Sequence, residues 1–318
     1  MTPAKHARMN LLALSGPLRT FVRMATLHPV LWTKGTLLAP HHLQAQDQYL
    51  HAALAFHLGA LSPAPWGFST LDLDREALQG GTIVIRTAAG RLPDGLWFDA
   101  PADDPPAPPR AVSEAWRPDQ RALTAYLAVP EYRPGGRNVA PTRDGVATRW
   151  HADETLRRDE TTGLGERAIQ MARPNLRLLL EGESLEGYAT MPVARLLRGA
   201  DGQLTLDPTF VPPLLDVGGS EGLLAIARRL VERIAARAGA LSGTRRQRNQ
   251  GLADFSVTDV ASFWLLYTLN THLPQLRHLH EVRRGHPVAL WEAMVALAGA
   301  LQTFVPAPQP LPAYDHLR

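Results

Sequence analysis

The spacing of apolar residues changes along this chain, and each change marks a different kind of expected structure. From His41 to Leu58, polar residues separate leucines that recur at helical intervals. This spacing is typical of an amphipathic helix and not of a strand, where polar and apolar residues alternate. Pro40 suits a first helical turn, whereas Ser62 and the prolines after it stop a helix. We therefore expect a helix reaching Leu61.

A short apolar run precedes this helix. Val30, Leu31 and Trp32 predict a strand, Lys34 and Gly35 predict a turn, and Leu37 and Leu38 predict that the strand resumes.

Between Trp66 and about Leu197, short β-favouring runs alternate with turn residues, as in TIVIRTA, LTAYLAV and RLLLEG. This pattern predicts a β-sandwich. Ile83 and Ile85 alternate with Val84 and Arg86, which indicates a strand with one buried face. The sequence PDG at 93–95 favours a tight turn, so GRLPDGLWF is expected to form a hairpin.

Two loops interrupt the β-region. Residues 101–112 hold too many prolines for a paired strand, so we expect an extended surface segment there. Residues 133–145 are rich in glycine and proline and predict a second loop. Both loops are candidates for partner contacts, although a plain connection is the commoner outcome.

After Asp216 the pattern becomes helical. The first predicted helix has an apolar stripe at Leu223, Ile226, Leu230, Ile234 and Leu241. A second helix, from Ser256 to about His272, is apolar nearly all round, so we expect it to be buried. A third helix carries near-heptad apolar positions that include Trp291, Met294 and Leu301, which favours self-association. The expected architecture is therefore mixed, with a β-sandwich followed by a helical bundle.

Composition bounds the class of protein. The chain has 318 residues, of which 45% are hydrophobic and 20% charged, so it has enough apolar residues for a folded core. No apolar run approaches the ~20 residues that span a bilayer, and we expect no direct membrane insertion. The chain has no cysteine, which excludes disulfides, thiolate metal sites and cysteine nucleophiles.

The net charge of +3 gives little reason to expect nucleic acid. A local exception is a basic stretch that could contact phosphates or an acidic partner, but a solvated helix face beside a flexible turn is the simpler interpretation. It comprises Arg228, Arg229, Arg233, Arg237, Arg245, Arg246 and Arg248.

One segment imitates a catalytic motif. Residues Gly218–Gly222 satisfy G-x-S-x-G, and Asp259 and His272 follow in the order of a serine hydrolase. Prolines before the motif disrupt the strand that a nucleophile elbow needs, and the sequence after it is helical. We therefore interpret Ser220 as a helix N-cap and keep the hydrolase as an alternative.

The histidines do not have the spacing of a metal site. His41 and His42 are adjacent and point in different directions on a helix, and no HExxH motif is present. We expect surface or helix-end roles for these two, for His51 near Asp47, and for the later histidines. No glycine-rich nucleotide loop is present either, so we expect no cofactor and no metal. The later histidines are His278, His280 and His286.

Three motifs in a fixed order resemble one family. They are VLWTKGTLLAPHHLQAQDQY at 30–49, the sequence Trp66-Gly67-Phe68, and GRLPDGLWFDAP at 90–101. Together they resemble the TssK family of type VI secretion baseplate subunits, from Met24 to the end of the chain. The resemblance implies a non-enzymatic, trimeric adaptor in the bacterial cytoplasm, at the inner face of the inner membrane. Its implied partners are the TssF/TssG wedge and the TssJ, TssL and TssM membrane complex.

The resemblance also implies a division of the chain. We expect a disordered upstream extension over 1–23 and a strand and helix joining neck and shell over 24–62. A β-sandwich shell over 63–198 and a helical trimerisation neck over 199–305 would follow. Residues 306–318 are rich in alternating proline, which indicates a linker, and we expect a head domain that would dock on TssJ, TssL and TssM to be absent.

Two sets of residues are candidates for contacts. The interaction and structural set is Trp32, Gly35, Pro40, His42, Gln44, Asp47, Trp66, Pro93, Asp94 and Gly95. The trimer-neck set is Leu230, Ile234, Trp264, Trp291, Met294 and Leu301. A charged residue at Trp291 is expected to dissociate the trimer. The alternative function is a phage-tail-like receptor-binding or virion protein.

Overall fold

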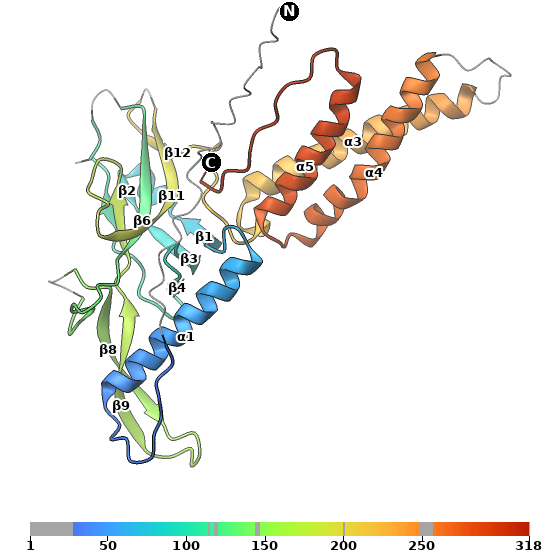
Figure 1. The fold of residues 1–318 in the computed structure, drawn as a ribbon. Helices are drawn as coiled ribbons and strands as arrows, with labels where there is room; N and C mark the ends of the chain where they lie inside the picture. The colour runs from blue at the N-terminus through green and yellow to red at the C-terminus, as the bar shows by residue number, and fades with distance from the viewer. Residues whose placement is uncertain are drawn as a thin grey trace, which may run out of the picture. The chain divides into compact units, whose positions relative to one another are not determined.

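A computed structural model describes residues 28–113, 115–117, 120–143, 147–199, 201–248 and 257–317 (Figure 1). The chain divides into two compact units, Met1–Pro63 and Ala64–Arg318. The upstream extension expected over 1–23 lies outside the described residues. The second unit holds β-sheets followed by helices, which confirms the predicted fold class.

The described portion of the first unit is dominated by helix α1 (Pro40–Leu61). Pro40 occupies its first turn, and the N–H of Ser62 donates to the carbonyl of Leu58 at the carboxyl end. The strand predicted at Val30–Trp32 is wrong. This segment has no regular structure, because its described residues have no neighbouring strand with which to form a ladder.

In the part of the chain that the structure describes, the β-domain of the second unit contains four sheets. Their orders are β1-β3-β4, β10-β6-β11-β12, β2-β5 and β7-β8-β9. The elements are β1 (Gly67–Leu73), α2 (Arg75–Gln79), β2 (Thr82–Ile83), β3 (Ile85–Arg91), β4 (Trp97–Ala100), β5 (Arg110–Ala111), β6 (Ala122–Pro130), β7 (Val139–Ala140), β8 (Trp150–Arg158), β9 (Glu166–Pro174), β10 (Arg177–Leu180), β11 (Tyr188–Arg198) and β12 (Leu204–Leu206).

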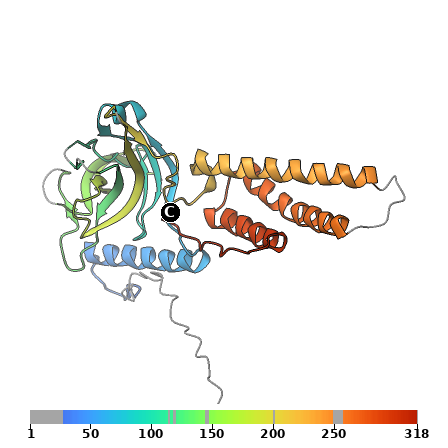
Figure 2. The same cartoon turned by 90° about the horizontal axis from the view of Figure 1, so that it is seen from above.

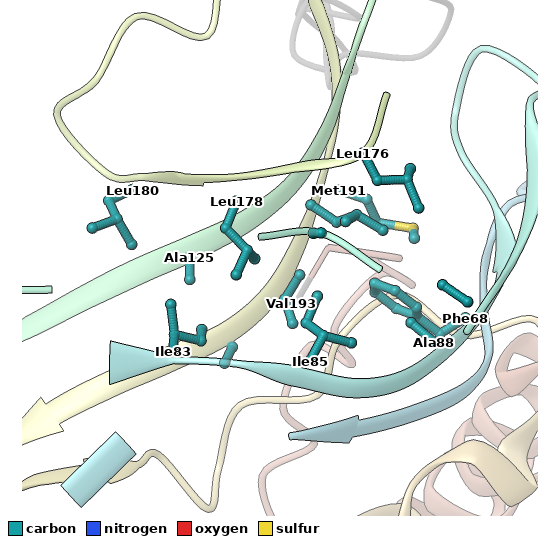
Figure 3. Packing of buried hydrophobic residues seen from close by; sticks show 14 of the residues in the cluster. Phe68, Ile83, Ile85, Ala88, Ala125, Leu176, Leu178, Leu180, Met191 and Val193 are labelled. Carbon is teal, nitrogen blue, oxygen red and sulfur yellow. The ribbon is translucent and has the colours of Figure 1, made fainter. Parts of the chain in front are cut away.

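Inward-facing residues of the β1-β3-β4 sheet and of the β10-β6-β11-β12 sheet share one apolar core (Figure 3). Along β6, Leu123, Ala125 and Leu127 are buried at every second position, as strand pleating requires. Ile83 and Ile85 are buried while Arg86 is exposed, as the alternation predicted, but the strand is interrupted at Val84, so Ile83 ends β2 and Ile85 begins β3 in a different sheet. Burial of each such large side chain stabilises the fold by about 2 kcal/mol.

The hairpin predicted around the PDG sequence is present between β3 and β4. Arg91 pairs with Trp97, and the N–H of Gly95 donates to the carbonyl of Leu92 at 2.9 Å. Gly95 has φ +95°, which a residue without Cβ adopts most easily. Asp94 tightens the turn, because its Oδ1 accepts from the N–H of Leu96.

The boundaries of the β-region differ from expectation in two places. β5 pairs with β2 immediately after the last proline of the 101–112 loop, and Ala107 and Val112 are buried, so this segment is not merely a surface connection. β12 pairs with β11 beyond residue 198, the predicted end of the sandwich. Register and pairing depend on distant strands, which local composition does not report.

The helical region follows a short turn. It comprises η1 (Val217–Gly219), α3 (Glu221–Arg248), α4 (Val257–Val282), α5 (Pro287–Leu301) and η2 (Gln302–Phe304). α3 packs against α4, and α4 packs against α5 (Figure 2). The shared core includes Leu224, Ala227, Val231, Leu269 and Leu290.

Two expectations about these helices need correction. The buried stripe of α3 is centred about one residue later than predicted, and Ile226 is 43% exposed. α4 is not buried all round, because Leu266, Leu269 and Leu276 face the core while its opposite side stays exposed. The stretch Pro287–Phe304 is long and apolar enough to cross a membrane by length and composition, but α5 places Leu290 in the bundle core.

Candidate interaction surfaces

The N-terminal candidate residues make local contacts around the start of α1. The N–H of Ala39 donates to Nδ1 of His42 at 3.2 Å, which satisfies one of the free donors at the helix end. The ring centroid of Trp32 lies 5.9 Å from that of His42. Gly35 takes φ +87° in the turn before the helix.

The rest of this N-terminal set is solvent-facing. Trp32 is 53% exposed, and Gln44 and Asp47 are exposed on α1. No residue of α1 is buried, and its leucines remain exposed. Pro40 and His42 therefore have a visible local role in starting the helix, whereas no contact among the described residues explains Gln44 and Asp47, which are exposed.

Trp66 lies where the β-domain meets the helical region. Its neighbour Gly67 has φ +136°, and a Cβ on Gly67 would lie 2.7 Å from the backbone carbon of Leu214. The N–H of Phe68 donates to Pro213, and Phe68 accepts in turn from the N–H of Leu215. The WGF sequence is thus held against the segment that leads into the helices, and Gly67 permits that close approach.

The PDG turn is tied to a distant strand. Asp94 forms an ion pair of 2.5 Å with Arg149, whose side chain is only 6% exposed. The guanidinium of Arg149 also donates to the carbonyl of Pro130 and lies 5.1 Å from the Trp150 ring centre. Pro93 is exposed at the tip of the turn. Asp94 and Gly95 therefore have structural roles, and Pro93 is the accessible member of the three.

The residues predicted for the trimer neck do not share one surface. Ile234 is buried in the protomer's own core, and Leu230, Met294 and Leu301 pack against that core from its edge. Trp291 is half-buried, with its ring centroid 5.8 Å from that of Tyr314. Of this set, Trp264 is the residue that is mainly exposed, at 53%.

Trp264 belongs to an aromatic stripe on α4, which consists of Val260, Phe263, Trp264 and Tyr267. All four are at least 41% exposed, and their spacing places them along one side of the helix. The Trp264 ring is edge-on to both aromatic neighbours, at centroid distances of 5.7 Å and 5.8 Å. Phe263 and Tyr267 also line a shallow cavity of about 250 Å³.

Comparison with known proteins gives a consistent assignment. Residues 42–318 match the family described as Bacterial Type VI secretion, VC_A0110, EvfL, ImpJ, VasE. The chain is 33% identical over 293 residues to the type VI secretion system baseplate component TssK1 of Pseudomonas aeruginosa. The chain belongs to the VasE/TssK family. The match covers 90% of this chain and 64% of the length of TssK1.

Solved structures of TssK have the same fold. A crystal structure of TssK superposes with a TM-score of 0.82 at 30% identity, covering 92% of this chain and 65% of that one. TssK in a TssK–TssF–TssG baseplate subcomplex, determined by cryo-electron microscopy, gives a TM-score of 0.80 at 27% identity, covering 92% and 93%. These matches favour the TssK family over the phage-tail alternative.

The serine of the G-x-S-x-G sequence caps a helix in this TssK relative. The Oγ of Ser220 accepts from the N–H of Leu223 at 3.3 Å, at the start of α3. Asp216 has the same role in the preceding turn, where its side chain accepts from the N–H of Gly218. Asp259 and His272 both lie on α4, not on strands as the hydrolase arrangement requires. The N-cap interpretation is therefore confirmed in its geometry.

The remaining sequence candidates are dispersed. Within the described ranges, no group of three or more histidine and carboxylate side chains is placed to hold a metal ion. Arg228, Arg229, Arg233 and Arg237 are exposed on α3, as a solvated face would be. The side chains of Arg245, Arg246 and Arg248 lie outside the described portion of the chain.

Sequence reasoning missed two sets of contacts. One is Arg149, the buried partner of Asp94. The other joins His286 and His316, whose rings stack at a centroid distance of 5.0 Å. Neither pair shares a local motif, since the partners are far apart along the chain. The third family motif, through Asp94, pointed near the first site, and the second motif, through Trp66, pointed near the second.

Proposed function

We propose that this chain is a structural subunit of the type VI secretion baseplate, at the cytoplasmic face of the inner membrane, and that it works by binding rather than catalysis. The observation that supports this proposal is the match to TssK over both the β-domain and the helical region. The superposition on TssK of the TssK–TssF–TssG subcomplex covers 92% of this chain and therefore includes β-domain and helices together.

We propose that the chain self-associates through the aromatic stripe on α4. The aromatic stripe leaves four large apolar side chains in contact with water, although the rest of the bundle has a well-covered core. Burying such side chains is favourable by about 2 kcal/mol each, so a copy of the same stripe is a suitable partner. We propose that three copies meet through this surface. Trp291 is a weaker candidate than predicted, because Tyr314 already contacts it within the chain.

Light scattering tests the self-association. The unmodified chain is expected to have a mass near three times 34.8 kDa. Trp264→Glu places a charge in the stripe and is expected to reduce the mass to that of one chain. Leu156→Glu is the matched control, because Leu156 is also exposed, at 63%, but lies on β8. A Trp264→Glu protein of unchanged mass would exclude the stripe as the contact.

We propose that the β-domain is the part of this chain that docks on the TssF/TssG wedge. We further propose that docking on TssJ, TssL and TssM depends on the region of TssK1 that this chain does not match. A pull-down with purified cognate proteins tests both assignments. This chain is expected to retain TssF and TssG and to lose TssL and TssM. Full retention of TssL or TssM would contradict the division of roles, whereas loss of TssF and TssG would contradict the baseplate assignment.

A further inference from the structure

The segment after α5 returns to the point where the β-domain meets the helices. We call Tyr314–His316 the latch segment, and the residues that receive it, Trp66, His286 and Trp291, the socket. The Nε2 of His316 lies 2.8 Å from the carbonyl oxygen of Trp66. The His316 ring is edge-on to the Trp66 ring, with centroids 4.6 Å apart. Tyr314 contacts the rings of both Trp291 and His286.

His286 completes the socket and links three regions of the chain. Its Nδ1 accepts from the N–H of Val288 at 3.2 Å, which caps α5. Its Nε2 lies 2.9 Å from the carbonyl oxygen of Ala64, at the start of the β-domain. Its ring stacks on that of His316 with planes 17° apart. Displacement of the latch segment would therefore uncover one face of the residue that caps α5.

The hydrogen-bond partners determine the protonation of His286 and the position of the Nε2 proton on His316. A carbonyl oxygen only accepts, so the Nε2 of each histidine carries the proton. The N–H of Val288 only donates, so Nδ1 of His286 is unprotonated. His286 is therefore neutral in the closed arrangement. Burial lowers the pKa of His316 and so disfavours its charged form, and when that ring is neutral the hydroxyl of Tyr314, 2.9 Å away, donates to its Nδ1.

Adding a proton to either Nδ1 is unfavourable in this arrangement. On His286 it would set two donors against each other, Nδ1–H and the N–H of Val288. On both rings it would place two cations 5.0 Å apart in a half-buried site. Burial lowers the pKa of both histidines, and the charge of His286 lowers the pKa of His316 further.

Other ionisable groups beside His286 and His316 also affect the charge of this site. The hydrogen bond to the carbonyl of Trp66 and the carboxylate of Asp315 raise the pKa of His316, and the hydrogen bond to the carbonyl of Ala64 raises the pKa of His286. Tyr314 stays neutral, because burial raises its pKa to about 12. Arg91 donates to the carbonyl of Pro65, between the two backbone acceptors, and adds positive charge to the region.

We propose that the latch segment and the socket form a proton-sensitive latch, which holds the chain after α5 against the β-domain when His286 and His316 are neutral and releases it when they are protonated. The latch closes within one chain. It therefore does not depend on the trimer or on the proposed baseplate function.

Thiol labelling tests the latch, because the chain has no native cysteine. Leu317→Cys, labelled with bimane, places a fluorophore one residue after His316, whose ring centroid lies 4.6 Å from that of Trp66, so an indole that quenches bimane by contact is close by when the latch is closed. Emission is expected to be low at pH 8 and to rise as the pH falls, with a midpoint below the ordinary histidine value of about 6.5. The same label at Leu156→Cys, on β8, is the control for direct effects of pH on the dye.

Two further variants separate the latch from general unfolding. His316→Gln cannot gain a proton at this position, so only His286 can still titrate, and the pH dependence of the emission is expected to weaken with a shifted midpoint. Tyr314→Phe removes the donor to the neutral ring and is expected to move the midpoint to higher pH. Far-UV circular dichroism should stay constant over the transition. Constant emission in the parent protein, or an unchanged midpoint in His316→Gln, would overturn the proposal.

Discussion

Arg149 donates a hydrogen bond of 2.5 Å to Oδ2 of Asp94, 55 residues earlier in the chain. Asp94 sits in the turn between β3 and β4, whereas Arg149 directly precedes β8. Asn175, which follows β9, donates backbone and side-chain hydrogen bonds to Arg149 and Thr148. The family-like hairpin is therefore joined by a largely buried ion pair to the start of the β8–β9 hairpin.

Breaking this ion pair is expected to destabilise the β-domain. Asp94→Ala leaves the buried guanidinium without its carboxylate and should lower the free energy of unfolding by about 2–4 kcal/mol. Urea denaturation measures the change. Glu166→Ala is the control, because it removes the exposed Arg158–Glu166 pair and should cost less than about 1 kcal/mol. An equal decrease in the free energy of unfolding in the two variants would show that the buried ion pair stabilises the protein no more than the exposed one.

Replacement of Gly67 is expected to disturb the approach of β1 to Leu214. Gly67→Ala combines strain at φ +136° with a clash at 2.7 Å against backbone, so the unfolding free energy should fall by about 2 kcal/mol or more. Gly239→Ala is the control, because a Cβ at Gly239 in α3 meets no atom within 4 Å. That control should stabilise the protein by about 0.5–1 kcal/mol. Thermal unfolding of both variants gives the comparison.

The capping role of Ser220 predicts a change in stability rather than in activity. Ser220→Ala should lower the unfolding free energy by about 1 kcal/mol, whereas Ser220→Asp, which retains an acceptor, should lose much less. A fluorophosphonate probe should not label the unmodified protein. Labelling at Ser220, detected by mass spectrometry, would restore the hydrolase alternative.

Asp104 predicts a pH effect in the acidic range. Its Oδ2 accepts from the N–H of Asp99, and burial, with the charges of Asp103 and Asp99, raises its pKa above the ordinary 3.8. Between 3.8 and the raised value the folded chain keeps a proton that the unfolded chain has lost. Stability is therefore expected to fall as the pH rises through this window.

Asp104→Asn isolates that effect. The asparagine side chain keeps an acceptor for the N–H of Asp99 but cannot ionise. Stability should therefore fall less as the pH rises, and the free energy of unfolding at pH 7 should be higher than in the parent protein. Asp103→Asn is the control, because Asp103 is exposed. Denaturation curves at several pH values measure both. A variant that is less stable than the parent protein at pH 7 would contradict the prediction.

Features determined by neighbouring residues were predictable from sequence alone. Pro40 and Ser62 set the ends of α1, Gly95 permits the turn of the β3–β4 hairpin, and Ser220 caps α3. Each depends on bonds within a few residues, so the local chemistry is sufficient. The order of strands and helices, and hence the fold class, followed from the same local signals, whereas the family followed from the resemblance of three motifs to TssK.

Tertiary structure alone decided which apolar residues are covered and which distant groups meet. α4 is apolar on nearly every side, yet only packing against α3 and α5 distinguishes buried Leu269 from exposed Trp264. Trp291 has the spacing of an intermolecular seam but contacts Tyr314 in the same chain. Periodicity reports which positions share a face, but not what lies opposite that face, because the opposing groups come from remote regions of the chain.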